Sequence, residues 1–205
     1  MYRGERFNSI SHLIGAVFAV SGTSMLITHA SFFGDVWKIV SFSIYGFTLI
    51  LLYTCSTLYH SLKGRAKEVF QRLDHISIYL VIAGSYTPFA LVPLRSTTGW
   101  WVFGIIWGLA IFGITQELIL GKKTRILSLV LYLVMGWLVT GTFKTLKETL
   151  PAAGIFWLAL GGIFYTLGVI FFVLDEKIKH GHGIWHLFVL AGSFFQFFCI
   201  FNYIA

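Results

Sequence analysis

Five polar residues near the ends of apolar stretches have the types and spacing that could act together in chemistry: His60, His182, His186, Asp74 and Ser56. His182 and His186 are four residues apart, so on a helix their imidazole rings project from one side. Ser56 precedes His60 by the same spacing and shares its helix face. Ionisable side chains within apolar segments cost free energy, which makes them candidates for function.

Three imidazoles match the ligand set of a catalytic zinc site, which takes three protein ligands and leaves the fourth position to water. Such a metal lowers the pKa of its water to about 7 and creates a nucleophile at neutral pH. Asp74 could hydrogen-bond that water or a ligand imidazole, and Ser56 could anchor Asp74, the water or a substrate carbonyl. Each element also has an ordinary explanation, because histidines four residues apart can simply pack, and an aspartate opening a helix complements its dipole.

The composition identifies the elements that must position these residues. The chain has 205 residues, of which 57% are hydrophobic and only 11% charged, whereas soluble proteins carry about 25% charged residues. A helix needs roughly 20 apolar residues to cross the hydrocarbon core. Seven long stretches contain no Asp, Glu, Lys or Arg, and they are 7–34, 39–62, 75–94, 96–116, 126–143, 149–174 and 180–205.

These stretches predict an all-α protein, a seven-transmembrane helix bundle forming a single domain over residues 1–205. They are apolar throughout, whereas barrel strands alternate apolar and polar residues. The first stretch exceeds the apolar core of a cleaved signal peptide, so we expect it to be retained as a span. Gly104 and Gly108 form a small-residue pair that we expect to pack against a neighbouring helix of the same chain. Cys55 and Cys199 lie deep in apolar stretches, as small buried hydrophobic residues do.

The basic residues predict the orientation, because Lys and Arg concentrate in cytoplasmic loops. Eleven lie in the N-terminal tail and in the loops after spans two, four and six, and only four lie on the other side. The N-terminus is therefore predicted to be cytoplasmic, the C-terminus outside, and the protein to reside in the cell membrane. The net charge of +7 then faces anionic lipid rather than nucleic acid.

The number of crossings also predicts that the polar residues share one depth. Between His60 and His182 the chain crosses the membrane four times, an even number, so it returns to the same face. His60, Asp74, His182 and His186 should therefore meet in one leaflet. The sequence favours a metal site there, without identifying the ion.

Several motifs together resemble one family. They are Ser56-Thr-Leu-Tyr-His60, Leu73-Asp74-His75 followed by Ala83-Gly-Ser-Tyr-Thr-Pro88, His182-Gly-Ile-Trp-His186, and the opening Glu5-Arg-Phe-Asn8-Ser-Ile-Ser-His12. In this order they are similar to the motifs of the bacterial hemolysin III family, within the progestin and adipoQ receptor superfamily. The resemblance covers essentially the whole chain.

The resemblance implies seven spans with a cytoplasmic N-terminus, and a zinc ion held by His60, His182 and His186, as in the adiponectin receptors. Asp74 and Ser56 match the other shared polar positions. A wider grouping with alkaline ceramidases implies metal-dependent hydrolysis of lipid amides. Gln196 departs from the pattern, because many bacterial members carry a histidine there, and it could alter what fills the cavity.

Two functions remain open. One is a zinc-dependent hydrolase of a lipid amide or ester at the cytoplasmic leaflet, in which Asp74 moves the proton. The other is a non-catalytic lipid sensor or regulator of membrane state with a structural zinc. A transporter ranks last, because its ionisable residues would be spread at mid-membrane. Glu5, Asn8 and His12 are either partners of the site or ordinary interfacial residues, and the oligomeric state is open.

Overall fold

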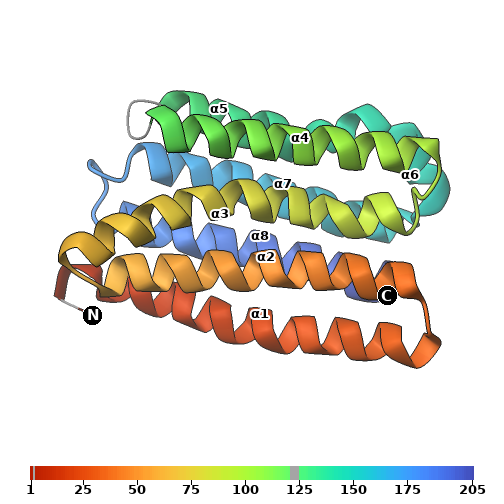
Figure 1. The fold of residues 1–205 in the computed structure, drawn as a ribbon, viewed down its shortest axis with the longest axis horizontal. Coiled ribbons are helices and arrows are strands. Elements are labelled where there is room, and N and C mark those ends of the chain that lie inside the picture. Colours follow the sequence, from red (N-terminus) through yellow and green to blue (C-terminus); the bar gives the residue numbers. More distant parts are fainter. Residues whose placement is uncertain (2, 121–124) are drawn as a thin grey trace.

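A computed structural model of the chain describes residue 1, residues 3–120 and residues 125–205. Lys122 and Lys123, two of the eleven basic residues predicted to be cytoplasmic, lie outside the described residues. Long antiparallel helices run along one axis in seven passes, and the two termini lie at opposite ends of the bundle (Figure 1). The described part of the chain is helical between short turns and contains no strand. The all-α prediction is confirmed.

The passes follow one another through tight turns. They are α1 (Arg6–Phe33, after the short 3-10 turn η1, Arg3–Glu5), α2 (Val36–Ser61), α3 (Gly64–Leu91), α4 (Thr97–Leu120), a fifth pass made of α5 (Arg125–Gly136), η3 (Leu138–Thr142) and α6 (Phe143–Thr149), then α7 (Ala152–Val173) and α8 (Gly181–Tyr203). Gly34 caps α1 in the left-handed region, φ 67°, and Asp35 accepts hydrogen bonds from the first amides of α2. These caps make the sharp turn between the first two helices.

Six of the passes are long and apolar enough to cross a membrane. The exception is α3, whose shielded position explains its lower hydropathy. It packs against α2, α4, α5 and α8, and its final stretch from Ala83 to Leu91 is entirely buried. A helix that is covered by its neighbours needs fewer apolar side chains than one facing lipid. Outward-facing side chains of the other passes are large and apolar, among them Phe18, Phe32, Ile119 and Ile126.

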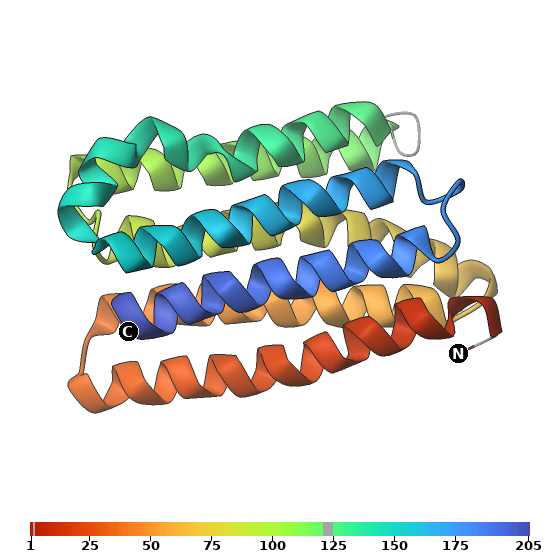
Figure 2. The same ribbon diagram turned by 180° about the vertical axis from the view of Figure 1, so that it is seen from behind.

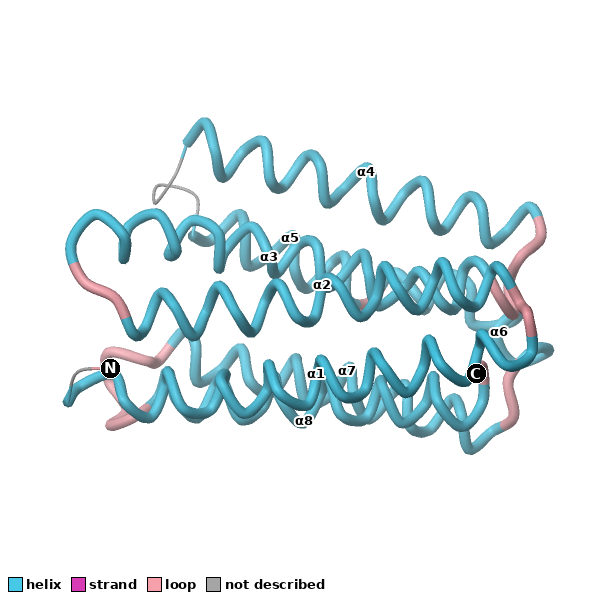
Figure 3. Tube along the Cα trace, turned by 60° about the horizontal axis from the view of Figure 1, so that its bottom comes forward, coloured by secondary structure: helices cyan, strands magenta, loops and turns pink. Residues whose placement is uncertain are grey.

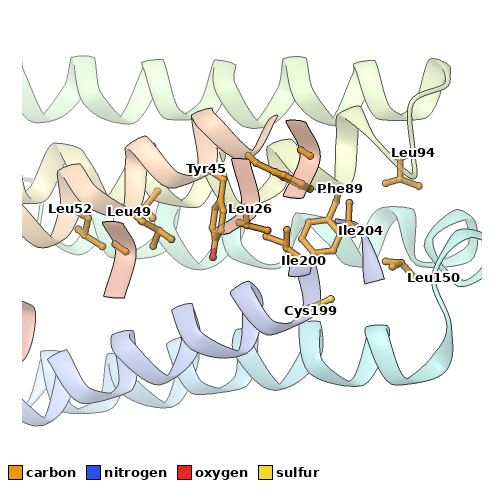
Figure 4. Packing of buried hydrophobic residues seen from close by; sticks show 14 of the residues in the cluster. Leu26, Tyr45, Leu49, Leu52, Phe89, Leu94, Leu150, Cys199, Ile200 and Ile204 are labelled. Atoms are coloured by element: carbon orange, nitrogen blue, oxygen red, sulfur yellow. The ribbon is translucent and has the colours of Figure 1, made fainter. Parts of the chain in front are cut away.

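Two buried apolar clusters hold the bundle. One joins α1, α2, α3 and α8 with the α6–α7 turn and contains Leu26, Tyr45, Leu49, Phe89 and Ile200 (Figure 4). The other lies between α3, α4 and α5 around Tyr79, Ile106 and Met135. Close approach of α3 to α2 requires Gly84, because a Cβ there would overlap the side chain of Thr48. No described atom lies near the corresponding positions of Gly104 and Gly108. The expectation that this pair packs within the chain is wrong, since it lies on the outer face of α4.

The fifth pass is broken near its middle, which the sequence did not predict. The helix ends at Gly136 and resumes through a 3-10 turn. The Tyr86 hydroxyl bridges the break, donating to the Gly136 carbonyl at 2.9 Å and accepting from the Val139 amide at 2.9 Å. Backbone groups at membrane depth must find partners within the protein, and Tyr86 of α3 supplies them here.

Successive passes run in opposite directions, so the turns between them alternate between the two ends of the bundle. The α2–α3 and α7–α8 turns lie at the same end as the N-terminus, and the α1–α2, α3–α4 and α6–α7 turns lie at the other end (Figures 1 and 2). The tube drawing shows the same grouping from another direction (Figure 3). The end of α2 and the start of α8 therefore meet at the N-terminal end of the bundle.

Candidate metal centre

Three histidine rings meet at this end of the bundle. His60 is in the last turn of α2, while His182 and His186 lie in the first turns of α8. The ring centroids form a nearly equilateral triangle, with separations of 5.0 Å for His60–His182, 5.0 Å for His60–His186 and 4.8 Å for His182–His186. One ligand nitrogen from each ring lies within 4.8 Å of the others, so this group could hold a metal ion.

Hydrogen bonds to the Nδ1 atoms assign the tautomer of all three rings. The His60 Nδ1 is 2.7 Å from the Glu5 carboxylate, and the His182 Nδ1 is 3.3 Å from the Asp175 carboxylate. The His186 Nδ1 is 3.1 Å from the Asn8 carbonyl oxygen and 3.1 Å from the Ser11 hydroxyl. Carboxylates and carbonyls only accept, so each Nδ1 carries the proton and each Nε2 presents a lone pair. Metal-binding histidines are oriented by such outer hydrogen bonds.

The donor set fits a metal ion. The His60 Nε2 is buried and has no hydrogen-bond partner within the described part of the chain, and an unpaired buried nitrogen is costly. Imidazole suits zinc, copper, iron and nickel.

Asp74 and Ser56 lie beside the histidines on a shared cavity. Both side chains line it, as do His182 and His186. Ser56 is fully buried, and its hydroxyl lies beside the Asp74 carboxyl. The Asp74 residue is 9% exposed. The structure thus gathers all five residues of the predicted site at one end of the bundle.

The cavity extends from this polar end into the apolar interior. It has a volume of about 140 Å³, and its deeper walls are apolar side chains of α3, α5, α7 and α8, including Ile78, Leu133, Val169 and Val189. Gln196 lines its far part, ten residues beyond His186, or about 15 Å along the helix. A second cavity of about 110 Å³ shares Gln196, Tyr86 and Trp137 with the first. The break in the fifth pass therefore lies where the two cavities meet.

His12 is a fourth histidine at the same place. Its ring stacks on His186, with a centroid distance of 3.6 Å and an angle of 12° between the ring planes. It also meets Tyr53 edge-on. Both ring nitrogens are buried without a hydrogen-bond partner in the described residues, and the ring lines the cavity. Of the two interpretations of His12, the structure favours a place within the site.

The other titratable residues have separate places. His75 contacts the buried Glu117 of α4 at 3.1 Å, which joins α3 to α4 as a structural residue would. Glu117 is 7% exposed, and His75 and Ser128 both contact its carboxylate. His180 packs edge-on against Phe7, and His29 lies among Phe33 and Phe201 at the other end. Cys55 and Cys199 are buried and free.

Sequence reasoning missed the acceptors that orient the rings. It left Glu5 and Asn8 between two interpretations and did not consider Ser11 or Asp175. Asp175 could have been found, because it is a carboxylate in the short turn before His182. The Glu5 contact depends on how η1 folds back onto α2, which spacing along the chain does not determine.

Comparison with known proteins agrees with the geometry. The family model described as Haemolysin-III related matches residues 1–197. The chain is 44% identical to "Hemolysin-3" of Bacillus cereus over 201 residues, covering 98% of this chain and 91% of that protein. It is 44% identical to the "Hemolysin-3 homolog" of Bacillus subtilis (strain 168) over 200 residues, covering 97% and 93%. It is also 30% identical to human "Monocyte to macrophage differentiation factor" over 207 residues, covering 96% and 83%.

The match runs through every pass of the bundle, from the N-terminal turn that contacts His60 to α8. The apolar passes and these relatives together indicate a multi-pass protein of the bacterial cell membrane. The chain belongs to the haemolysin-III related family.

Proposed function

We propose that the protein is a zinc-dependent hydrolase of lipid amides or esters, working in the cytoplasmic leaflet. One observation supports this above all: three imidazoles with hydrogen-bonded Nδ1 atoms meet beside an apolar cavity, which His182 and His186 line. The polar end suits a headgroup linkage, and the apolar walls suit an acyl chain. A membrane lipid has both parts in this order.

The chain's own residues have distinct roles in this proposal. Zinc bound by the three histidines would polarise a carbonyl group and acidify a water molecule. Asp74 takes the proton from the attacking water and returns it to the departing amine or alcohol. Ser56, beside Asp74 on the cavity wall, donates a hydrogen bond from its hydroxyl to the substrate carbonyl. The apolar lining of the cavity keeps the acyl chain beside these groups and excludes bulk water.

A turnover assay tests this proposal. The zinc-loaded protein in mixed micelles is offered ceramide-like amides, acyl-amino acids and acyl esters, and released fatty acid is measured by mass spectrometry. We expect release by the wild type and a loss of about 10²–10⁴-fold for Asp74→Asn, the range for a missing acid–base group. Glu148→Gln, a neutralised acid in the distant helix α6, is the matched control. Failure of fully loaded protein to turn over any of these lipids would sink the catalytic proposal.

A non-catalytic lipid sensor with structural zinc is the second candidate, favoured by the way the three ligands tie α2 to α8. Asp74→Asn separates the two candidates. If zinc stays bound and the cellular role persists in this variant, the sensor explains the protein better than the hydrolase.

A further inference from the structure

Glu5 joins three elements at the edge of the histidine group. One carboxylate oxygen, Oε2, accepts from the His60 Nδ1 at 2.7 Å and from the Asn8 Nδ2 at 2.7 Å. The other, Oε1, accepts from the Lys67 ammonium of α3 at 2.8 Å. Both carboxylate oxygens therefore contribute to holding the N-terminal turn η1 against α2 and α3.

The Lys67 ammonium lies 2.8 Å from Glu5 and forms an ion pair with its carboxylate, so the contact of Glu5 with His60 is charge-assisted. Such bonds are shorter and stronger than those between neutral groups. The 2.7 Å bond to His60 compares with 3.3 Å for His182 and 3.1 Å for His186. Of the three rings, His60 thus has the shortest hydrogen bond at Nδ1.

We infer that Glu5 is a positioning residue of the metal centre, which fixes the ring of His60 through Nδ1 while Lys67 holds the carboxylate in place. The N-terminal turn then supports the metal site without supplying a ligand. This inference rests on the proposed metal binding. A carboxylate hydrogen-bonded to a ligand imidazole fixes its tautomer and raises its basicity, and losing such a partner typically costs 10–100-fold in metal affinity.

The same segment also contacts a second ligand. The Asn8 carbonyl and the Ser11 hydroxyl, both in the first turns of α1, accept a shared hydrogen bond from the Nδ1–H of His186. Since His60 is on α2 and His186 on α8, Glu5 of η1 and the first turns of α1 orient ligands from two separate helices. Glu5 contacts His60, whereas the acceptors of His186 lie in α1, so losing Glu5 should loosen the His60 ring and leave the acceptors of His186 in place.

Zinc affinity measured by competition with a chelator of known strength tests the inference on the full-length protein in detergent. We expect Glu5→Ala to weaken zinc binding about 10–100-fold while one ion per chain still binds at saturation. Glu5→Gln keeps an acceptor for His60 but loses the ion pair with Lys67, so its effect should be smaller. Glu68→Gln, the same change at an exposed position next to Lys67, is the matched control and should leave the affinity unchanged.

Two further measurements separate positioning from general damage. The visible spectrum of cobalt-substituted protein should change for Glu5→Ala, because it reports ligand geometry, and stay the same for Glu68→Gln. In a His60→Ala background, Glu5→Ala should have no additional effect on the residual affinity. Equal zinc affinity for wild type, Glu5→Ala and Glu68→Gln would overturn this inference alone. If the wild type binds no metal at all, the inference and the proposed function fall together.

Discussion

Tyr86 secures the broken fifth pass, and removing its hydroxyl tests how the bundle tolerates that break. The Tyr86→Phe substitution keeps the ring but leaves the Gly136 carbonyl and the Val139 amide without this partner. Gly136 is not covered by the rest of the chain and Val139 is half-buried, so the cost depends on their depth in the membrane. A polar group left unsatisfied away from water costs about 1–3 kcal/mol, so the two together should lower the free energy of unfolding by about 2–6 kcal/mol. The membrane interior offers little water to replace the hydroxyl.

Tyr45→Phe is the matched control for this experiment. The Tyr45 side chain is buried in the apolar cluster, and its hydroxyl has no hydrogen-bond partner within the described residues. The same chemical change should therefore be neutral or slightly stabilising there. Reversible unfolding in mixed micelles with increasing dodecyl sulfate, followed by far-ultraviolet circular dichroism, measures both variants. Equal stability of Tyr86→Phe and Tyr45→Phe would refute the role given to the Tyr86 hydroxyl.

Three further tests probe the packing inside the bundle. His12→Phe should keep the ring stack on His186 and retain zinc. His12→Ala leaves a void and should lower the free energy of unfolding by about 2–5 kcal/mol. Equal stability of the two variants would contradict the stacking role. Gln196→Leu removes a buried amide oxygen without a hydrogen-bond partner among the described residues. It should tighten binding of a saturated fluorescent fatty acid by about 1–2 kcal/mol, or roughly 5–30-fold. Unchanged binding would mean that the acyl chain lies elsewhere. Gly84→Ala should destabilise the bundle by about 1–3 kcal/mol through overlap with Thr48, and Thr48→Ala should recover part of that loss in the unfolding assay.

The architecture and the histidine group could be predicted because both depend on counting. Charge-free stretches long enough to cross a bilayer give the number of passes, and the parity of passes places His60 and His182 on one face. Spacing by four residues then puts His186 beside His182. None of these steps needs the conformation of a side chain.

The features that could not be predicted depend on local conformation and packing. The fifth stretch is free of charged residues, and glycine is frequent inside membrane helices, so Gly136 alone did not mark the end of α5. The break is stabilised by Tyr86, fifty residues away in the chain. The outward position of Gly104 and Gly108 depends on which face of α4 meets α3. The partner of each Nδ1 depends on ring orientation and on how η1 folds back onto α2, which hydropathy cannot show.

The account depends on His60, His182 and His186 binding one metal ion through nitrogen. X-ray absorption spectroscopy of the zinc-loaded protein measures this directly, beside the His186→Ala variant. The account predicts three imidazole nitrogens at about 2.0–2.1 Å from the zinc, and loss of the bound ion or of one imidazole in the variant. A wild-type protein that retains no zinc after purification and reloading, or a zinc with sulfur ligands from the buried cysteines, would contradict it.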